Sequence, residues 1–297
     1  TTNCVSTSGD FSHGIIAQSI GGGGGRIVGN AATTNINLGS GNYGGDGGEV
    51  SVTNGNQVWT HGNYSNAIVA QSIGAGGGLM DIQGTNLSFG APYQFGASNT
   101  VTVNTDGSIW TYGNQSIGVL AQSIAGGGGY GVASGTVSFG ASTNSGQYNA
   151  GNVVVNVNNT ITTYGNVSPG IVAYSAGGGG GVAMVNSVDQ AVSMIHGNGN
   201  GGSVTVDVNQ SIYTNGSYSY GVIAGSFGGG GGILIGSNGV TAEQGQGLGD
   251  GGSVSVTVAK NKTVAVYGSN STAIWTKSSN GKDDPTVNVE AGASVIG

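Results

Sequence analysis

A short motif, in which apolar residues flank Ala-Gln-Ser before a run of glycines, recurs along the whole chain. Its first copy covers residues 14–20, and residues 21–25 are all glycine. The alanine of the motif returns at intervals of 51 to 53 residues, as Ala17, Ala70, Ala121, Ala173 and Ala224. A sixth, less regular copy at residues 273–278 has Thr276 in the alanine position. Such a constant period is typical of a repeat protein, not of a globular domain built around one site.

The glycine-rich composition is compatible with disorder, a collagen-like triple helix or a tightly turned β repeat. The chain of 297 residues contains 65 glycines, and only 6% of its residues are charged. Collagen needs glycine at every third position, whereas residues 152–157 contain none. Disordered chains have low hydrophobicity, but 36% of this chain is apolar and Val, Ile and Thr are abundant. The composition therefore favours the β repeat.

The first half of each repeat contains three short runs that alternate as β-strands do. In the second repeat they lie within residues 47–52, 57–62 and 67–73, and later repeats keep this order. In the middle run one position is always apolar and the next varies, so we expect the constant set to face the core and the variable set to face outward. The constant set is Val58, Ile109, Ile161, Ile212 and Val264, and the variable set is Trp59, Trp110, Thr162, Tyr213 and Ala265.

Two further columns follow from the same strand. Threonines share the inward parity in five repeats, as Thr7, Thr60, Thr111, Thr163 and Thr214. A glycine then marks one recurring corner, as Gly9, Gly62, Gly113, Gly165, Gly216 and Gly268. We expect glycine at this corner because it adopts positive φ at little cost.

The faces of the Ala-Gln-Ser strand are ambiguous, because Ile16 and Ile20 lie opposite Ile15 and Ala17. We expect this strand to be covered on both faces, with the glycine-rich segment as the second cover. The rest of each repeat is looser and varies in length, so it is interpreted as a second coil turn with a variable loop. The sequence thus predicts an all-β chain, a parallel β-solenoid with about two rungs of ~26 residues per ~52-residue repeat.

The whole chain, residues 1–297, is predicted to be a single solenoid segment. The repeats lie near residues 1–46, 47–98, 99–150, 151–201, 202–251 and, in part, 252–297. Both ends of the chain lie inside repeats, so we expect it to be a segment of a longer polypeptide. No basic flank with an apolar run opens it as a signal peptide would, and no stretch approaches the ~20 apolar residues that span a bilayer.

Charge and cysteine content exclude several classes of partner. The formal net charge is −7, and Arg26 is the only basic residue before Lys260. Without clustered Lys and Arg, binding to nucleic acid or to an anionic membrane is not expected. Cys4 is the only cysteine, so no disulfide closes within the chain and no two-cysteine metal site exists. A nearly cysteine-free chain is consistent with export through an oxidising compartment.

Residues that carry catalysis or bind metals elsewhere do not form a convincing site here. Asp283 and Asp284 are the only adjacent acidic pair, and we interpret them as a solvated turn. His13, His61 and His196 fall at different phases of the repeat, so they are expected to be surface or loop residues. Residues 44–50 and 249–252 resemble calcium-binding nonapeptides, but tandem copies are missing, and no Lys-Ser/Thr follows the glycine runs as in a phosphate loop. The sequence predicts no metal and no cofactor.

One group of residues favours binding. Aromatic or imidazole rings share the outward parity of the middle strand, at Trp59, His61, Trp110, Tyr112, Tyr164 and Tyr213. A row of exposed rings suits sugar rings or a neighbouring rod, so we name these residues as a candidate surface-binding stripe. The alternative is that loops from the second half of each repeat cover them.

The repeated pattern S-x-G-I-x-A-Q-S-I-G-G-G-G-G, preceded by G-x-V-x-V and I-x-T-x-G, resembles the glycine-rich passenger region of Gram-negative type V autotransporters. The resemblance implies a right-handed parallel β-helix that is displayed at the cell surface or released. It also implies roles in adhesion, aggregation or biofilm formation, and an outer-membrane β-barrel elsewhere in the parent chain.

We therefore expect a non-catalytic structural and adhesive rod whose partners are surface glycans or neighbouring cells. An alternative is a carbohydrate-active β-helix enzyme, a polysaccharide lyase or hydrolase, which would need a basic residue or paired carboxylates in a cleft. A third hypothesis is self-association into fibres through the rod ends or the aromatic stripe.

Overall fold

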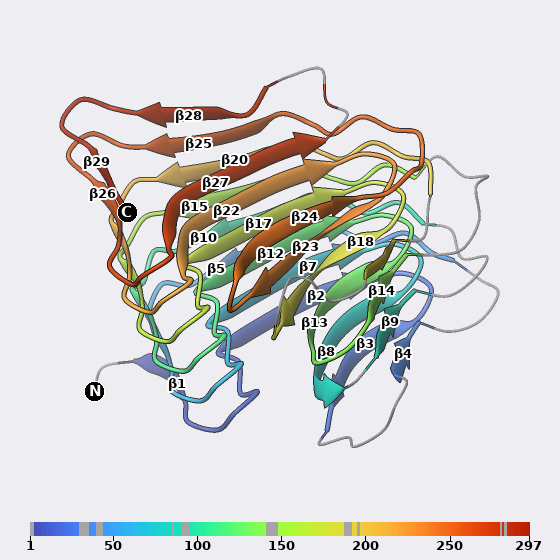
Figure 1. The fold of residues 1–297 in the computed structure, drawn as a ribbon, viewed down its shortest axis with the longest axis horizontal. Coiled ribbons are helices and arrows are strands. Elements are labelled where there is room, and N and C mark those ends of the chain that lie inside the picture. The colour runs from blue at the N-terminus through green and yellow to red at the C-terminus, as the bar shows by residue number, and fades with distance from the viewer. Residues whose placement is uncertain are drawn as a thin grey trace.

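The computed structural model describes residues 3–29, 36–39, 44–84, 86–90, 96–140, 148–186, 192–194, 197–279, 281 and 284–297. Every regular element in these ranges is a β-strand (Figure 1). Within the same ranges, no helix has the length and apolarity needed to cross a membrane. The strands of successive repeats lie side by side in five stacked sheets, as the prediction of an all-β chain with stacked parallel strands required.

We name the five sheets the valine, aromatic, shared, glycine and outer sheet, in the order in which the chain passes through them along each repeat. Each sheet collects strands from successive turns of the coil, one from each turn except for β23 (Gly231–Gly236) and β24 (Gly239–Gln244), which both lie in the glycine sheet. The valine sheet contains β5 (Val50–Thr53), β10 (Val101–Asn104), β15 (Val153–Val157), β20 (Val204–Val208), β25 (Val254–Val258) and β28 (Thr286–Val289). The aromatic sheet contains β1 (Cys4–Thr7), β6 (Gln57–Thr60), β11 (Ile109–Thr111), β16 (Ile161–Thr163), β21 (Ile212–Thr214), β26 (Thr263–Val266) and β29 (Ser294–Ile296).

The shared sheet contains β2 (Ile15–Ile20), β7 (Ile68–Ile73), β12 (Val119–Ile124), β17 (Ile171–Ala176), β22 (Tyr220–Phe227) and β27 (Thr272–Ser279). The glycine sheet contains β3 (Gly24–Val28), β8 (Gly77–Gly84), β13 (Gly128–Ala133), β18 (Gly180–Val185), β23 (Gly231–Gly236) and β24 (Gly239–Gln244). The outer sheet contains β4 (Ile36–Leu38), β9 (Leu87–Phe89), β14 (Val137–Phe139) and β19 (Val192–Met194).

The strand register shows that one turn of the coil takes one whole repeat. Val50 of β5 pairs with Val101 of β10, 51 residues further on, and Val101 pairs with Val153, 52 residues further on. The expectation of two rungs per repeat is therefore wrong. The second half of the repeat forms the glycine and outer sheets of the same turn, because glycine runs let the chain fold back beside the shared sheet.

The shared sheet is covered on both faces, as the ambiguous parity of the Ala-Gln-Ser strand predicted. All six residues of β7 are buried. Ile68 and Ala70 pack in a core enclosed by the valine, aromatic and shared sheets. Val69 and Ile73 point the other way, into a second core between the shared and glycine sheets. The glycine-rich segment is thus the second cover of this strand.

A third, smaller core lies between the glycine and outer sheets. Met80 of β8 is fully buried there with Phe89 of β9 and Phe139 of β14. The rings of Phe89 and Phe139 come from adjacent turns, and their centroids are 5.3 Å apart. Three parallel layers of apolar side chains therefore run along the coil axis, one of them in each space between sheets.

The corner glycines lie at one recurring corner of the coil, as expected, but positive φ is not the reason that glycine is needed there. Gly113 is not among the residues with positive φ, whereas Gln115, two residues later, has φ 53°. A Cβ atom on Gly113 would lie 1.9 Å from the carbonyl oxygen of Gly62 in the preceding turn. Glycine is needed because consecutive turns approach each other too closely here for any side chain.

The inward face of the aromatic sheet matches the prediction. Val58 is 1% exposed, and Ile109, Ile161, Ile212 and Val264 are fully buried. Four of the five inward threonines, all but Thr214, close the next corner with side-chain hydrogen bonds: Thr60 Oγ1 donates to the carbonyl of Ser65 at 2.6 Å, and Thr111 Oγ1 donates to that of Ser116 at 3.1 Å. These bonds satisfy polar groups that would otherwise be buried without a partner.

The coil changes its course near the C-terminal end of the chain. β24 turns back and pairs antiparallel with β23, so the parallel stacking of the glycine sheet ends there. The last pairs in the valine and aromatic sheets are only 31 residues apart, as in Ser255 with Thr286 and Thr263 with Ser294. The final turn therefore passes from the shared sheet directly to the valine sheet.

Candidate functional site

The candidate site is a double column of rings on the outer face of the aromatic sheet. Side chains two residues apart on a strand point to the same face, and in-register parallel strands place equivalent residues about 4.8 Å apart. Trp59 on β6 therefore lies next to Trp110 on β11, its partner in the register. We call the following set the aromatic ladder: Trp59, His61, Trp110, Tyr112, Tyr164, Tyr213 and Tyr267.

The rings beside the corner glycines form a regular stack. His61 and Tyr112 lie with centroids 4.8 Å apart and planes at 6°, and Tyr112 and Tyr164 lie 4.9 Å apart at 5°. Because the stack spacing equals the strand spacing, the rings contact each other without bending the backbone. Asn215 interrupts the column, and Tyr267 continues it one turn later.

The second column lies on the strands themselves. The indoles of Trp59 and Trp110 meet edge to face, with centroids 5.4 Å apart and planes at 79°. Thr162 replaces a ring in the next turn. Tyr213 links the two columns, because its ring lies parallel to that of Tyr267 with 6.5 Å between centroids.

The ladder is open to solvent on its outer side. Tyr112 is 40% exposed, Tyr164 46% and Tyr267 62%, whereas Trp59 and Trp110 are half-buried. The alternative expectation, that loops from the second half of the repeat cover the stripe, is wrong for these tyrosines. The second half of the repeat packs against the face of the shared sheet that points away from the aromatic sheet, so it does not reach the ladder.

Sequence reasoning placed six members of the ladder on one face and missed Tyr267. The missed residue stands directly before the corner glycine Gly268, as Tyr112 stands before Gly113. The signal was thus present in the column of residues that precede the corner. His61 is held in this column by its Nδ1, which donates to the carbonyl of Thr7 at 3.1 Å.

A buried ionic cluster near the N-terminal end of the coil escaped the sequence analysis. The carboxylate of Asp81 on β8 is fully enclosed, and its Oδ2 accepts from Nε of Arg26 on β3 at 2.6 Å. His13 Nε2 donates to Asp81 Oδ1 at 2.9 Å, and His13 Nδ1 accepts from the backbone N–H of Asn66 at 2.9 Å. His13 was expected to be a surface or loop residue; it lies in the loop before β2, but it is buried there and not on the surface.

The geometry of this cluster is that of a cross-link between layers. Both ring nitrogens of His13 and both oxygens of Asp81 have partners, and Arg26 Nη2 also donates to the carbonyl of Phe11 at 2.6 Å. Each nitrogen of the His13 ring and each oxygen of Asp81 is thus engaged within the protein, and the carboxylate is enclosed. The cluster ties the segment before β2 to β3 and β8.

The other residues that the sequence analysis considered for catalysis or metal binding do not form a common site among the described residues. His196 and Asp283 lie outside the described residues, and Asp284 is exposed. Asp46, in the glycine-rich stretch that resembles a calcium loop, accepts the backbone N–H of Ala97 at 2.8 Å. Across the described ranges, no three His, Cys, Asp or Glu side chains form a group that could hold a metal ion.

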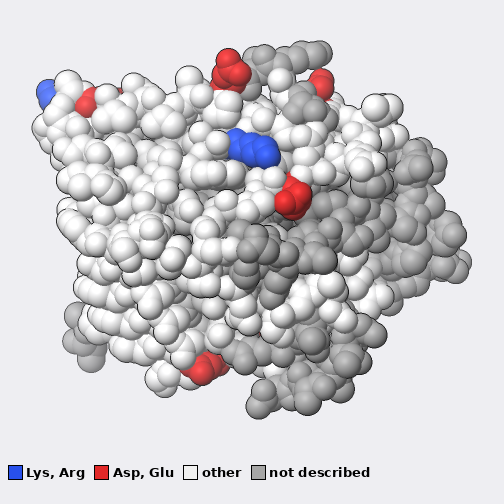
Figure 2. All heavy atoms as spheres, viewed as in Figure 1, with Lys and Arg blue, Asp and Glu red and all other residues white. Residues whose placement is uncertain are grey.

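Charged side chains are sparse on the face of the molecule that Figure 2 shows. Comparisons with protein-family models, with curated proteins and with solved structures find no match to this chain. The functional inference therefore rests on the ladder and the coil that presents it.

Proposed function

We propose that this chain is a structural and adhesive rod segment that makes contacts through the aromatic ladder and carries out no catalysis. The observation that supports this most is the in-register stack of exposed rings at His61, Tyr112 and Tyr164. Flat apolar ring faces in a row offer the same contact again at each turn. Weak contacts that repeat along a rigid face add up to a strong attachment.

The setting of the rod is part of the same proposal. The repeated glycine motif and the stacked parallel strands fit the passenger of a type V autotransporter, a right-handed β-helix displayed at or released from a bacterial surface. An outer-membrane β-barrel would lie elsewhere in the parent chain. The partners would be surface glycans or rods on neighbouring cells, which leads to adhesion, aggregation or biofilm.

The enzyme alternative has less support. A glycoside hydrolase uses two carboxyl groups that face one cleft, and a general acid must reach its substrate. Asp81 is enclosed, and its two oxygens are taken by His13 and Arg26. The ladder itself contains no carboxyl group.

The proposal is tested with beads that carry the whole 297-residue chain. The ladder variant combines Tyr112→Ser, Tyr164→Ser and Tyr267→Ser, and the control combines Thr102→Ser, Val154→Ser and Thr205→Ser on the outer face of the valine sheet. We expect beads with the unchanged chain and with the control to clump or to remain on a bacterial biofilm after washing. Beads with the ladder variant should lose most of this retention.

Two results would overturn the proposal: retention of the ladder-variant beads equal to that of the unchanged chain, or no retention of either. Light scattering of the soluble chain separates the two kinds of partner. A particle mass that rises with concentration, and does so less for the ladder variant, identifies contacts between rods. A constant mass together with retained beads identifies the biofilm surface as the partner.

A further inference from the structure

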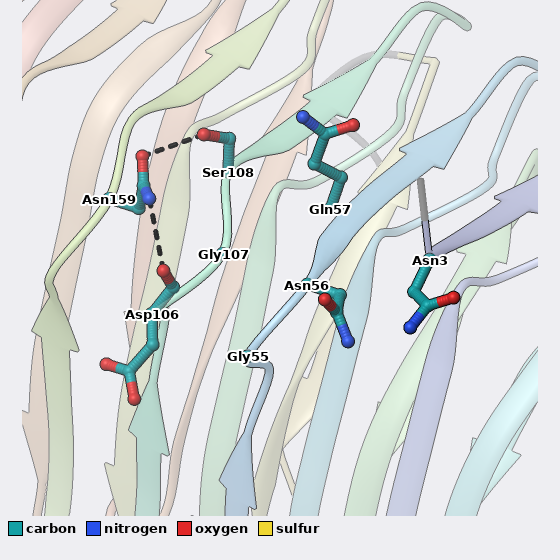
Figure 3. Close-up of a pocket in the computed structure, with 8 residues that line it drawn as sticks. All are labelled: Asn3, Gly55, Asn56, Gln57, Asp106, Gly107, Ser108 and Asn159. Atoms are coloured by element: carbon teal, nitrogen blue, oxygen red, sulfur yellow. Dashed lines mark hydrogen bonds between the residues drawn. The ribbon is translucent and has the colours of Figure 1, made fainter. Parts of the chain in front are cut away.

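A polar pocket opens at the corner where the valine sheet turns into the aromatic sheet. It has a volume of about 300 Å³ and is lined by residues of four successive repeats (Figure 3). Its lining includes Asn3, Asn56, Gln57, Asp106, Ser108 and Asn159. This volume lies at the lower end of the range of ~300–1,000 Å³ that ligand pockets have.

One side of the pocket is pre-organised by hydrogen bonds. Ser108 Oγ donates to Asn159 Oδ1 at 2.7 Å, and Asn159 Nδ2 donates to the carbonyl of Asp106 at 3.1 Å (Figure 3). Asp106 Oδ1 accepts from Nδ2 of Asn158 at 2.8 Å. The carboxylate of Asp106 is thereby fixed, and its Oδ2 remains available as an acceptor.

The other side of the pocket offers unused amides. The side chains of Asn56 and Gln57 make no hydrogen bond with any residue in the described ranges. Each amide brings two donors and one carbonyl acceptor. The two amides point in different directions and away from the carboxylate of Asp106 (Figure 3), so the three groups can serve hydroxyl groups on different parts of a ligand, each of which donates one hydrogen bond and accepts others.

The pocket continues into the tryptophans of the ladder. Gln57 and Trp59 lie two residues apart on β6, so their side chains share a face about 7 Å apart. Ser108 and Trp110 have the same relation in the next turn. The amide of Gln57 thus stands beside Trp59, and the hydroxyl group of Ser108 stands beside Trp110, so polar groups and apolar ring faces lie together as a sugar ring needs.

The charge around the pocket selects among sugars. Asp106 is the one ionisable side chain in the lining. Lys262, at the same corner three turns further on, donates from Nζ to Oε1 of Gln210 at 3.0 Å. The chain as a whole carries a formal charge of −7. A uronate or phosphate group would meet a carboxylate without a compensating cation, and this disfavours anionic glycans.

We infer that this corner pocket, together with Trp59 and Trp110, is a subsite for a neutral oligosaccharide. The inference rests on the proposed adhesive function and names one of its ligands. In this arrangement Gln57 binds a hydroxyl group of the sugar unit that lies against the indoles, and Asn56 and Asp106 bind hydroxyl groups elsewhere on the oligosaccharide. Because Gln57 and Trp59 lie two residues apart on β6, this unit follows the strand direction, which crosses the coil axis.

The test uses tryptophan fluorescence of the whole chain. The chain has three tryptophans, and Trp275→Phe removes the one on β27 that is far from the pocket. Cello-, xylo-, malto- and chito-oligosaccharides serve as neutral probes, and oligogalacturonate as the anionic probe. We expect at least one neutral probe to shift the emission of Trp59 and Trp110 in a saturable way, and the anionic probe to leave it unchanged.

Substitutions locate the binding site. Gln57→Ala should weaken binding of the active probe by about tenfold, since it removes a hydrogen bond and leaves the rest of the pocket intact. Trp110→Ala should weaken it by a similar factor, as measured by calorimetry. Gln210→Ala, at the position of the same corner equivalent to Asn56, should bind as the unchanged chain does.

Three outcomes would overturn the inference: no neutral probe binds, only the anionic probe binds, or Gln57→Ala and Gln210→Ala bind equally well. If one of these occurs while tyrosine-dependent bead retention persists, the corner pocket is not a glycan subsite and the adhesive function stands. If bead retention also fails, both proposals fail. Capture of a peptide at the pocket in place of a sugar would assign it to protein contacts and would likewise overturn the inference.

Discussion

The phenol ring of Tyr112 stacks on that of Tyr164, with 4.9 Å between their centroids and 5° between their planes. The two residues follow β11 and β16, and their backbones are in register, since Tyr164 N–H donates to the carbonyl of Thr111 at 2.8 Å. The stack therefore follows directly from the spacing of the coil. A flat face of rings arises because the same position of the repeat holds an aromatic residue in consecutive turns.

The stack predicts an energetic coupling between Tyr112 and Tyr164. In a double-mutant cycle with Tyr112→Ala and Tyr164→Ala, we expect a coupling of about 0.5–1.5 kcal/mol in the free energy of unfolding, as for other aromatic pairs. The control pair is Tyr112→Ala with Tyr267→Ala, three turns apart, whose effects should add. Urea unfolding measures both cycles. Equal coupling in the two cycles would contradict a direct contact.

The corner glycines should tolerate no side chain. For Gly113→Ala we expect a loss of at least about 3 kcal/mol in unfolding free energy, because the new Cβ would lie 1.9 Å from a backbone oxygen of the preceding turn. Gly55→Ala is the matched control, since a Cβ there meets no atom within 4 Å. Thermal unfolding compares the two. A Gly113→Ala chain as stable as the Gly55→Ala chain would refute the close approach of the turns.

Much of the strand pattern was predictable because side chains alternate between the two faces of a strand, and the same alternation recurs at equivalent positions in each repeat. Val58 and Trp59 differ in exposure as their parity requires, and the same contrast returns at Ile109 and Trp110. One repeat alone would be a weak signal. Several aligned repeats make a constant position distinguishable from a variable one, and this identified the core face and most of the ladder.

The number of turns per repeat was not predictable from the same pattern. A period gives the distance between equivalent residues, but it does not give the number of sheets that the chain visits between them. The runs before β8 and β13 consist of glycine with one alanine each, Ala75 and Ala125, so they show no alternating pattern that would reveal which layer they cover. The fold-back onto the shared sheet is set by backbone packing, and Gly113 was likewise assigned a φ-based role although its need for glycine comes from packing.

The ionic cluster escaped prediction because it occurs once. Asp81 and Arg26 are 55 residues apart in the sequence, and His13 and Asp81 are 68 apart. Neither distance stands out unless one knows that a turn takes one repeat. Once one turn is known to take one repeat, Arg26 on β3 and Asp81 on β8 can be recognised as neighbours on adjacent strands.

Asp81 should be important for stability. For Asp81→Asn we expect a loss of about 3 kcal/mol, because Arg26 and His13 lose the carboxylate they share in a buried site. Adding Arg26→Gln to this variant should recover part of the loss, since it removes the charge left without a partner. The exposed Asp46 offers a control, and Asp46→Asn should cost no more than about 0.5 kcal/mol. Urea unfolding measures the stability of the unchanged chain, Asp81→Asn, Asp81→Asn/Arg26→Gln and Asp46→Asn. Equal stability of Asp81→Asn and Asp46→Asn would argue against a structural role for Asp81.

Two buried tyrosines should respond differently to removal of the hydroxyl group. Tyr174 Oη donates to the carbonyl of Gly231 and accepts from the N–H of Gly181 at 3.1 Å, so Tyr174→Phe should cost about 1–2 kcal/mol. Tyr130 Oη is buried and has no hydrogen-bond partner among the described residues, so Tyr130→Phe should be neutral or slightly stabilising. Thermal unfolding at neutral pH compares the stability of the two variants. A similar loss of stability in Tyr174→Phe and Tyr130→Phe would contradict the prediction.

The same two phenols predict a loss of stability in alkali. Burial raises the pKa of Tyr130 and of Tyr174 well above the ordinary value of about 10, so the folded chain keeps these protons where the unfolded chain releases them. Their contribution to stability is complete below about pH 10 and falls as the pH rises above it, by up to about 1.4 kcal/mol per pH unit for each group. Urea unfolding between pH 9 and 11.5 should therefore show a shallower decline for the double variant Tyr130→Phe/Tyr174→Phe than for the unchanged chain. The exposed pair Tyr112→Phe/Tyr164→Phe should leave the steep decline in place, and the same slope in all three chains would show that these buried phenols do not govern it.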